Sequence, residues 1–396
     1  MSKRDVLLRD GSTATTSTRR LRALVAYSAW SNFKPAVEKY LLALKMYTTF
    51  DVSYVHVTHD AKLNFDLNSF DVIFQNYCAR FVIDGLISEA YREALKAFRG
   101  LKVIAVQDEY DRTNVLHEAL QEFNFHLLLT CVQPEFWPRI YPPHKLPHLR
   151  LVHVLTGYVP EDLMEKYRTV TPLAERPIMI GYRGGYLGAR YGRLTMEKRE
   201  IGERMRKICE ARGLSCDIRT DAKNRIDGSA WFEFIGNCRA GLGSESGSNV
   251  FDFDGSIQKA WDELSRMRQH EISHEEFKPY IEHVESEFNM GQISPRIFEY
   301  AVMRTPMILF KGRYSDTLQP DVHYIPLEKD FSNVDQVLDK LSDLASLEAM
   351  ADRAYSDLVR SGRFGYRAFA WKLEAEITNV YNAEIRNRDQ SIKEER

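Results

Sequence analysis

The residues with the clearest chemical potential lie in two short segments between positions 238 and 308. The first segment is a loop of small residues that carries one carboxylate, Gly243-Ser-Glu-Ser-Gly-Ser-Asn249. Glycine and serine let backbone N–H groups approach a bound ligand closely. We therefore take Glu245, Ser246 and Gly247 as candidate ligand contacts, with Glu245 as a candidate catalytic group.

The second segment is the start of a predicted helix, Ile293-Ser-Pro-Arg-Ile-Phe-Glu299. Ser294 suits the residue that caps such a helix, and Pro295 suits its first helical position. The start of a helix attracts an anion with a free energy of about 0.3–2 kcal/mol. Ser294, Arg296 and Glu299 are therefore candidate binding residues. Two such segments, each with a carboxylate, predict a pocket for a phosphorylated ligand rich in hydroxyl groups.

The size and charge of the chain restrict the class of protein. Its 396 residues exceed the roughly 250–300 at which one hydrophobic core stops growing, so we expect two domains. A formal net charge of −2 argues against a general nucleic-acid binder, which usually carries an excess of basic residues. No apolar run approaches the roughly 20 residues of a transmembrane segment, and the N-terminus lacks the apolar centre of a secretion signal.

The five cysteines are far apart in the sequence and include no Cys-x-x-Cys pair. That spacing favours reduced thiols over a disulfide framework or a zinc site. The expectation is a soluble, cytoplasmic α/β protein.

Short apolar runs alternate with longer amphipathic ones in both halves of the chain. In the first half we predict strands at 21–27, 52–57, 70–75, 101–107, 125–131 and 151–155, with helices at 34–47, 83–99 and 113–122. In the second half we predict strands at 177–182, 214–218, 240–243, 306–310 and 323–327, with helices at 196–212, 231–237 and after 334. Strands that alternate with helices imply parallel sheets covered on both faces, and hence a doubly wound α/β fold.

The domain boundaries follow from this series of elements. We place a disordered tail at 1–20, an N-terminal Rossmann-like domain at 21–165, a C-terminal Rossmann-like domain at 166–375 and a charged helix or tail at 376–396. The linker falls within 158–176, and the charged helical segment 257–289 looks like an insertion. Doubly wound sheets bind ligands beyond the carboxyl ends of their strands. The cleft between the two domains is therefore the expected site.

The segment from Ser294 to Leu309 resembles the helix of form "FEAMACGTPVI" in the GT-B glycosyltransferases, whose two Rossmann-like domains face each other across a cleft. The resemblance implies that Glu299 binds the ribose hydroxyls of a nucleotide. The chain departs from the pattern twice: Arg304 stands in place of a glycine, and Gly291 stands where many retaining members carry a second glutamate. We expect that an insertion has separated the two glutamates and that Glu245 corresponds to the second one.

The resemblance also implies cations that face a leaving diphosphate at the first turn of the C-terminal domain. The candidates are Arg183, Arg190, Arg193 and Lys198. We rank Arg183 first because it directly follows a predicted strand. Fixed cations are needed since the departing nucleoside diphosphate gains negative charge, which preorganised donors stabilise. A solvated cationic loop is the alternative interpretation.

Two acidic residues, Asp108 and Glu109, follow the predicted strand 101–107. Retaining members of the family often carry a His-Asp-like pair at this tip, and the histidine is missing here. A carboxylate in this place can act as a general base that takes the proton of an acceptor. Asp108 can equally cap the helix that starts near Thr113. We keep both residues as catalytic candidates.

Other kinds of site find little support in the sequence. Asp252-Phe-Asp254 looks like the metal-binding pair of the other main glycosyltransferase fold, but that fold has a single nucleotide domain. The histidines show no zinc-binding spacing, and the glycine loops of dehydrogenases and ATPases do not occur. We predict no metal and no cofactor, with a nucleotide-diphosphate sugar as co-substrate.

The leading hypothesis is transfer of a sugar from a nucleotide-diphosphate donor to a glycan, a lipid or another hydroxyl acceptor, as in polysaccharide biosynthesis, with retention of configuration favoured over inversion. One alternative is an epimerase that acts on a nucleotide-sugar. The other is a GT-B-like scaffold that binds without catalysis, which the two departures from the motif favour. The base and sugar of the donor, the acceptor and the oligomeric state stay open.

Overall fold

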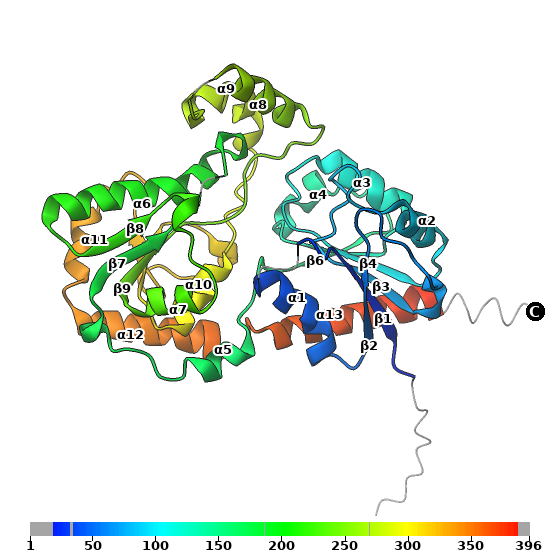
Figure 1. Cartoon of the computed structure of the whole chain (residues 1–396), viewed down its shortest axis with the longest axis horizontal. Coiled ribbons are helices and arrows are strands. Elements are labelled where there is room, and N and C mark those ends of the chain that lie inside the picture. The colour runs from blue at the N-terminus through cyan, green and yellow to red at the C-terminus, as the bar shows by residue number, and fades with distance from the viewer. Residues whose placement is uncertain (1–18, 32–34, 186, 269, 387–396) are drawn as a thin grey trace, which may run out of the picture.

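The computed structural model describes residues 19–31, 35–185, 187–268 and 270–386 of the chain. These residues form two lobes side by side, each built around a parallel β-sheet with helices on both faces, and a pair of helices projects above the contact between the lobes (Figure 1). Of the two predicted tails, residues 1–18 and 387–396 lie outside the described residues.

The N-terminal lobe contains a six-stranded sheet in the order β2-β1-β3-β4-β5-β6, in which every neighbouring pair is parallel. Its strands are β1 (Arg22–Tyr27), β2 (Asp51–His56), β3 (Val72–Gln75), β4 (Leu101–Ala105), β5 (Leu127–Thr130) and β6 (Arg150–His153). The helices of this part of the chain are α1 (Pro35–Tyr47), α2 (Glu89–Ala97), α3 (Thr113–Glu122) and α4 (Trp137–Ile140).

Strand β1 shows why the central strands of this lobe are largely apolar. Ala23 and Val25 point into the core cluster that includes α1, whereas Leu24 and Ala26 point into the cluster that includes α2 and α3. Successive side chains of a strand alternate between faces, so a strand covered on both sides buries every residue. The short apolar runs in the sequence therefore mark strands of a covered parallel sheet, as predicted.

The C-terminal lobe contains a five-stranded sheet in the order β11-β10-β9-β7-β8, and its neighbouring strands are also parallel. Its strands are β7 (Ile178–Arg183), β8 (Cys216–Arg219), β9 (Cys238–Gly243), β10 (Met307–Phe310) and β11 (Ile325–Leu327). The helices after the linker are α5 (Glu161–Lys166), α6 (Arg193–Arg212), α7 (Ser229–Gly236), α8 (Ser256–Met267), α9 (His274–Glu285), α10 (Pro295–Val302), α11 (Val334–Lys340), α12 (Leu344–Ala354) and α13 (Tyr366–Val380). The two sheets confirm the predicted doubly wound fold with two Rossmann-like domains.

The chain passes between the lobes at two adjacent points. Val159 pairs with Gly365, so the outgoing linker and the returning chain lie side by side. After this second crossing α13 packs on α1, and its residues Phe369 and Leu373 belong to a core cluster of the N-terminal lobe. Residues 366–375 of helix α13 lie within the range that we assigned to the C-terminal domain, yet the apolar face of this helix covers the N-terminal sheet.

The insertion at 257–289 forms the two projecting helices, α8 and α9, which pack on each other around Ile257, Phe277 and Ile281. The segments before α8 and after α9 extend to the N-terminal lobe. Phe251 and Phe288 are buried there with residues of α3 and β4. The insertion therefore fastens the C-terminal lobe to the N-terminal one.

Arg176 ends the linker and holds the segments that later form the site. Its side chain is 1% exposed, and its nitrogens donate to Thr171 O (2.9 Å), Cys238 O (3.0 Å), Met303 O (3.0 Å) and Thr305 Oγ1 (2.9 Å). Burial lowers the pKa of this guanidinium to about 10. One buried cation thus ties the linker to the start of β9 and to the end of α10.

Replacing this guanidinium should destabilise the C-terminal lobe. Arg176→Leu would leave buried carbonyl groups without donors, so we expect a loss of about 3 kcal/mol in the free energy of unfolding. Arg206→Leu is the matched control, since the one ion pair that Arg206 makes with the described residues is with Glu210 near the surface, worth at most about 0.5 kcal/mol. Thermal unfolding measures both variants, and equal unfolding temperatures would contradict the structural role of Arg176.

Candidate functional site

The glycine- and serine-rich loop after β9 is hydrogen-bonded to the turn before α10. Ser246 and Gln292 exchange two backbone hydrogen bonds, of 2.7 and 2.9 Å. Gly247 lies against the Gln292 side chain with a φ of +92°, a conformation that L side chains rarely adopt. The Gln292 amide in turn donates to Cys131 O of the N-terminal lobe (3.0 Å). The two sequence segments proposed for ligand binding thus meet, at the boundary between the lobes.

Glu245, a residue of this loop, has a buried side chain, at 3% exposure. Its Oε1 accepts hydrogen bonds from the backbone N–H groups of Arg313 and Tyr314. A Cβ atom placed on Gly291 would lie 1.7 Å from Oε1, and one on Gly312 would lie 2.4 Å from the carboxylate carbon. The Glu245 carboxylate therefore occupies the space beside position 291, the position where the family resemblance expects a glutamate.

Two cations lie beside the loop without a carboxylate partner among the described residues, Lys198 and Arg296. Lys198, on α6, donates from Nζ to Ser246 Oγ (3.1 Å). Burial, and then the positive charge of Arg296, lower the pKa of Lys198 to about 8, while Asp108 opposes this shift. Arg296, on α10, is 5.3 Å from the ring centroids of both Tyr182 and Trp231, a distance at which the rings attract a cation.

Glu299 lies one turn after Arg296 on the same helix. Its Oε2 accepts a hydrogen bond of 2.7 Å from the indole Nε1 of Trp231. Burial raises the pKa of Glu299, whereas the Trp231 hydrogen bond and the charge of Arg296 act in the opposite direction. Ser294 is the residue before this helix, and its side chain makes no capping hydrogen bond. Lys198, Ser246, Ser294, Arg296 and Glu299 are thus presented from neighbouring segments of the C-terminal lobe.

Two predicted cations are engaged by carboxylates of the protein. Arg183 donates to the Asp217 carboxylate (2.7 Å) and stacks on the ring of Phe234, 4.0 Å from its centroid. Arg193 forms a bidentate pair with Glu200, with distances of 2.7 and 2.6 Å. Their charges are therefore partly neutralised, in contrast to those of Lys198 and Arg296.

The two acidic residues after β4 have different surroundings. Asp108 adopts a positive φ of 57°. It accepts a hydrogen bond from the Tyr110 hydroxyl (2.7 Å), and about half of its side chain is exposed. Glu109 is buried, and its Oε1 accepts hydrogen bonds from the Thr130 hydroxyl and from Cys131 N (3.0 Å). Burial raises the pKa of Glu109 to about 7. Asp108 is therefore the carboxylate of the pair that remains open to solvent.

Asp108 does not cap helix α3, which was the alternative role that we predicted for it. Helix α3 begins after Arg112, which adopts a left-handed conformation and makes no side-chain capping bond. Asp252 caps a different helix, α8: its carboxylate accepts from the backbone N–H groups of Gly255 (2.9 Å) and Gln258 (2.9 Å) at the start of that helix. Within the described ranges, no group of three or more His, Cys, Asp and Glu side chains could hold a metal ion.

Sequence reasoning missed two residues that shape the site. Trp231 was read only as part of a helix, and Gln292 was not singled out. An indole N–H inside an apolar helix needs an acceptor when it is buried, which is the one signal that pointed to a polar partner for Trp231. No pattern in the sequence around Gln292 predicts the hydrogen bonds that it makes.

Comparisons with known proteins place the fold. No protein-family model matches the sequence, and no curated protein matches it significantly. The structure of Anabaena Alr3699/HepE in complex with UDP aligns with a TM-score of 0.50 at 11% identity, over 91% of this chain and 100% of that one. An alpha-glucosyltransferase in complex with UDP and DNA aligns with a TM-score of 0.52 at 12% identity, over 91% and 99% of the two chains.

A third structure, sucrose-phosphate synthase from Thermosynechococcus elongatus, aligns with a TM-score of 0.50 at 11% identity, over 92% of this chain and 100% of that one. These neighbours have the GT-B architecture, and at such low identities the likeness establishes the fold alone: this chain has the GT-B fold. None of its described helices combines the length and apolar character that crossing a membrane requires.

The contact between Gly291 and Glu245 can be tested by adding one methyl group. Gly291→Ala would push the buried carboxylate away from its two backbone donors, so we expect a loss of about 2–4 kcal/mol in stability. Gly185→Ala is the matched control, because a Cβ there meets no atom of the described residues within 4 Å. Thermal unfolding measures both.

The same contact predicts coupling between the two positions. Glu245→Ala removes the carboxylate that the new methyl group would strike, so adding Gly291→Ala to Glu245→Ala should cost much less than it costs alone. Strictly additive losses in the double variant would show that the two side chains do not meet.

Proposed function

We propose that this protein transfers a sugar from a nucleotide-diphosphate donor to a hydroxyl acceptor. The observation that carries the proposal is the pair of cations, Lys198 and Arg296, that have no carboxylate partner among the described residues and lie together beside the loop at 243–249. A diphosphate supplies the negative charge that these two groups lack. Charge-assisted hydrogen bonds of this kind are about twice as strong as neutral ones.

The neighbouring residues suit the rest of a nucleotide-sugar. Glu299 has one oxygen held by Trp231, which fixes the orientation of the carboxylate and leaves Oε1 to accept from a ribose hydroxyl. Ser294, whose hydroxyl makes no capping bond, and the backbone of Ser246 and Gly247 offer further polar contacts. The neighbours that were solved with UDP support a nucleoside diphosphate as the leaving group.

The charge that develops on the leaving diphosphate would be stabilised by the same two cations, because preorganised donors cost no reorganisation as the bond breaks. For a retaining transfer, the diphosphate itself can take the proton of an acceptor on the same face of the sugar. Asp108, half exposed and near enough to influence Lys198, would contact the sugar or the acceptor. Glu245 would act as a positioning residue, since its Oε1 already holds the backbone at 313–314. The acceptor is a glycan, a lipid or another hydroxyl compound.

The replacement of the motif glycine by Arg304 is compatible with a catalytic site, although from sequence it favoured a scaffold that binds without catalysis. Arg304 stands where the motif has a glycine, and its φ is +46°. The backbone thus keeps the left-handed turn that a glycine would allow, at a cost of about 1–2 kcal/mol for a side chain in this conformation. The turn at the end of α10 is preserved, so the loss of the glycine does not imply loss of the site.

The two cations predict a clear pattern in nucleotide affinity. Lys198→Ala and Arg296→Gln should each weaken UDP binding about 10- to 100-fold, since each removes a charge-assisted contact worth about 1.4–2.8 kcal/mol. Arg193→Ala is the matched control, because Arg193 is already paired with Glu200. Isothermal titration calorimetry measures the affinities. If both site variants bind UDP as the parent does, the diphosphate does not lie here.

The lowered pKa of Lys198 predicts a pH dependence of binding. Below pH 8 the ammonium is charged and attracts the diphosphate; above pH 8 the free protein holds it increasingly neutral, so UDP affinity should fall. Lys198→Arg should remove this fall, because arginine stays charged throughout the range. Without ligand the sign for stability is opposite: the folded-state pKa lies below the unfolded one, so stability rises between about pH 8 and 10.5. Affinity that stays flat from pH 7 to 9.5 in the parent would contradict the assignment.

A further inference from the structure

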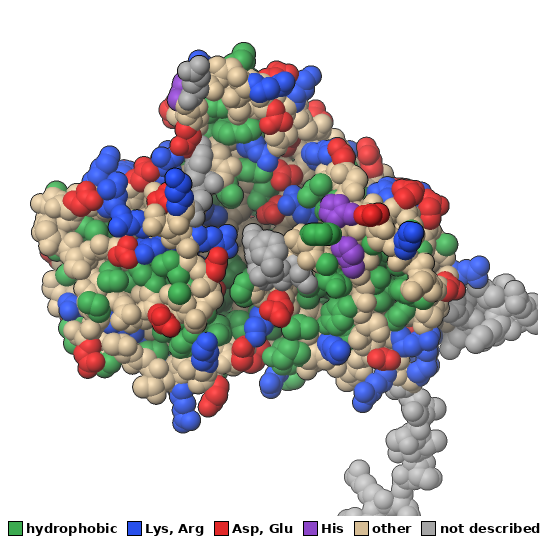
Figure 2. Space-filling model, viewed as in Figure 1, with side chains coloured by type: hydrophobic (Ala, Val, Ile, Leu, Met, Phe, Trp, Pro, Cys, Tyr) green, Lys and Arg blue, Asp and Glu red, His purple; other side chains and the backbone are tan. Residues whose placement is uncertain are grey.

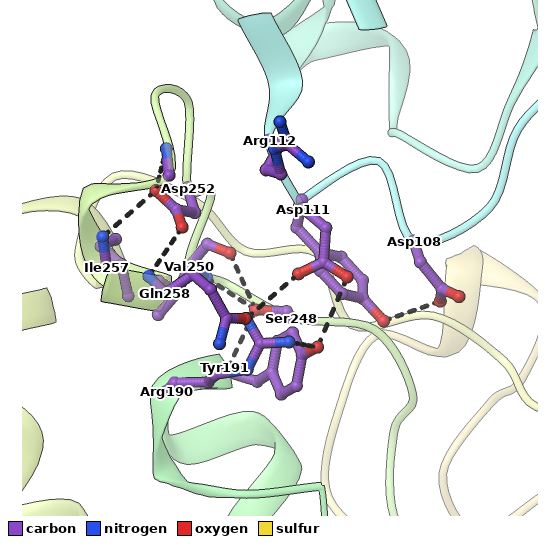
Figure 3. A network of polar contacts seen from close by, with 12 residues as sticks. Asp108, Asp111, Arg112, Arg190, Tyr191, Ser248, Val250, Asp252, Ile257 and Gln258 are labelled. Carbon is purple, nitrogen blue, oxygen red and sulfur yellow. Dashed lines mark hydrogen bonds and ion pairs between the residues drawn. The ribbon is translucent and has the colours of Figure 1, made fainter. Parts of the chain in front are cut away.

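A second polar cavity lies where the N-terminal lobe meets the projecting helices. Its volume is about 320 Å³, and its polar walls include Arg80 and Arg112 from the N-terminal lobe, Arg190 from the segment before α6, and Gln258 from α8. Figure 3 shows the contact network at this edge, with Asp111 directed toward Arg190 and Tyr191, and with Asp252 directed toward the start of α8. The surface is hollowed where the two lobes and the projection meet (Figure 2).

Three aspartates and three arginines line this cavity, but the contacts between them are long or exposed, or the carboxylate is directed to backbone groups. Asp252 is occupied by backbone N–H groups of α8. Asp111 is shared between Arg80 and Arg190, and both contacts are long, at 3.4 Å. Asp84 pairs with Arg112 at the rim, where its side chain is 81% exposed and the pair is therefore well screened. The guanidinium groups of Arg80, Arg112 and Arg190 are thus only partly satisfied by the aspartates that line the cavity.

Donor groups of these arginines remain unused. The Nε atom of Arg80 is buried and has no hydrogen-bond partner among the residues that the structure describes, which is costly for a charged group unless a ligand supplies an acceptor. Both hydrogen bonds that Arg112 makes with described residues, to Val82 O and to Asp84, start from Nη1. A planar guanidinium with free nitrogens suits the paired oxygens of a phosphate or a carboxylate.

The cavity is already assembled and lies next to the proposed donor site. Backbone hydrogen bonds join the lobes at this edge, from Thr113 N to Asp252 O (3.1 Å), from Asn114 N to Phe253 O (2.8 Å) and from Asp252 N to Tyr110 O (2.8 Å). Arg80 also contacts Asp108 at 3.4 Å, the carboxylate whose charge reaches Lys198. A molecule that fills the cavity can therefore extend toward the place where sugar transfer would occur.

We propose that this cavity binds an anionic group, a phosphate or a carboxylate, on the acceptor of the sugar. The identification of the occupant as an acceptor rests on the proposed function, whereas the anion site itself rests on the three arginines alone. A neutral acceptor offers the buried Arg80 Nε a hydroxyl oxygen but no negative charge, so the stronger charge-assisted hydrogen bonds favour acidic acceptors over neutral ones.

The test separates this site from the donor site by working in the Lys198→Ala background, in which anion binding at the donor site is weakened. Inorganic phosphate, glucuronate and neutral glucose are titrated into this variant, with calorimetry as the readout. Arg80→Gln and Arg112→Gln are then added singly. Arg206→Gln serves as the control, because Arg206 lies outside the cavity lining and its ionic partner among the described residues is Glu210.

We expect at least one of the two anions to bind and glucose not to bind. Each cavity variant should weaken the anion at least tenfold, and Arg206→Gln should leave it unchanged. Binding of phosphate alone would identify a phosphorylated acceptor, and binding of glucuronate as well would extend the class to acidic sugars. Arg112→Gln keeps the test decisive if Arg80→Gln does not fold, since the main ionic partner of Arg112 is exposed.

Absence of anion binding, or equal binding by the parent and both cavity variants, would overturn the proposal. UDP binding to the unmodified protein is measured in parallel. Loss of UDP binding with retention of the arginine-dependent anion site would remove the proposed function and leave the cavity intact, whereas the reverse result would remove only the cavity.

Discussion

The two backbone hydrogen bonds between Ser246 and Gln292 are the contact on which the candidate site depends. They close the excursion of the chain through α8 and α9, and so return the loop after β9 to the start of α10. Lys198 donates to the Ser246 hydroxyl and Arg296 lies on α10, so this closure sets the distance between the two cations. The entropic cost of closing a loop grows only slowly with its length. The insertion of α8 and α9 between the two segments of the site therefore destabilises their contact only a little.

The fold was predictable because its physical signal is local. A strand buried on both faces must be largely apolar, as residues 23–26 of β1 are. The end of helix α6 is marked by a single residue, Gly213, which has a φ of +65°. The destination of α13 was not predictable in the same way. Its pattern shows that one face is apolar, but whether that face meets the N-terminal or the C-terminal sheet depends on where the chain crosses back, beside Val159.

The site was predictable in its segments and less so in its residues. Composition pointed to the loop and to the start of α10, and these segments do meet. Sequence could not rank the cations, because their partners come from elsewhere in the fold. Asp217 on β8 engages Arg183, which we ranked first, whereas the partner of Lys198 among the described residues is the Ser246 hydroxyl. The same limit applies to Glu245, whose carboxylate reaches the space beside Gly291 only through the closure of the insertion.

The closure also links the lobes, and this gives the buried Glu109 a physical role. Its carboxylate accepts from the backbone N–H of Cys131, the carbonyl of Cys131 accepts from the Gln292 amide, and Gln292 holds Ser246. Each link joins groups that would be costly to leave unpaired in the interior. The N-terminal lobe is therefore held in register with the loop that carries the proposed diphosphate contacts. Asp108, the neighbour of Glu109, is in this way kept at a fixed distance from Lys198, as a transfer reaction between groups on two lobes requires.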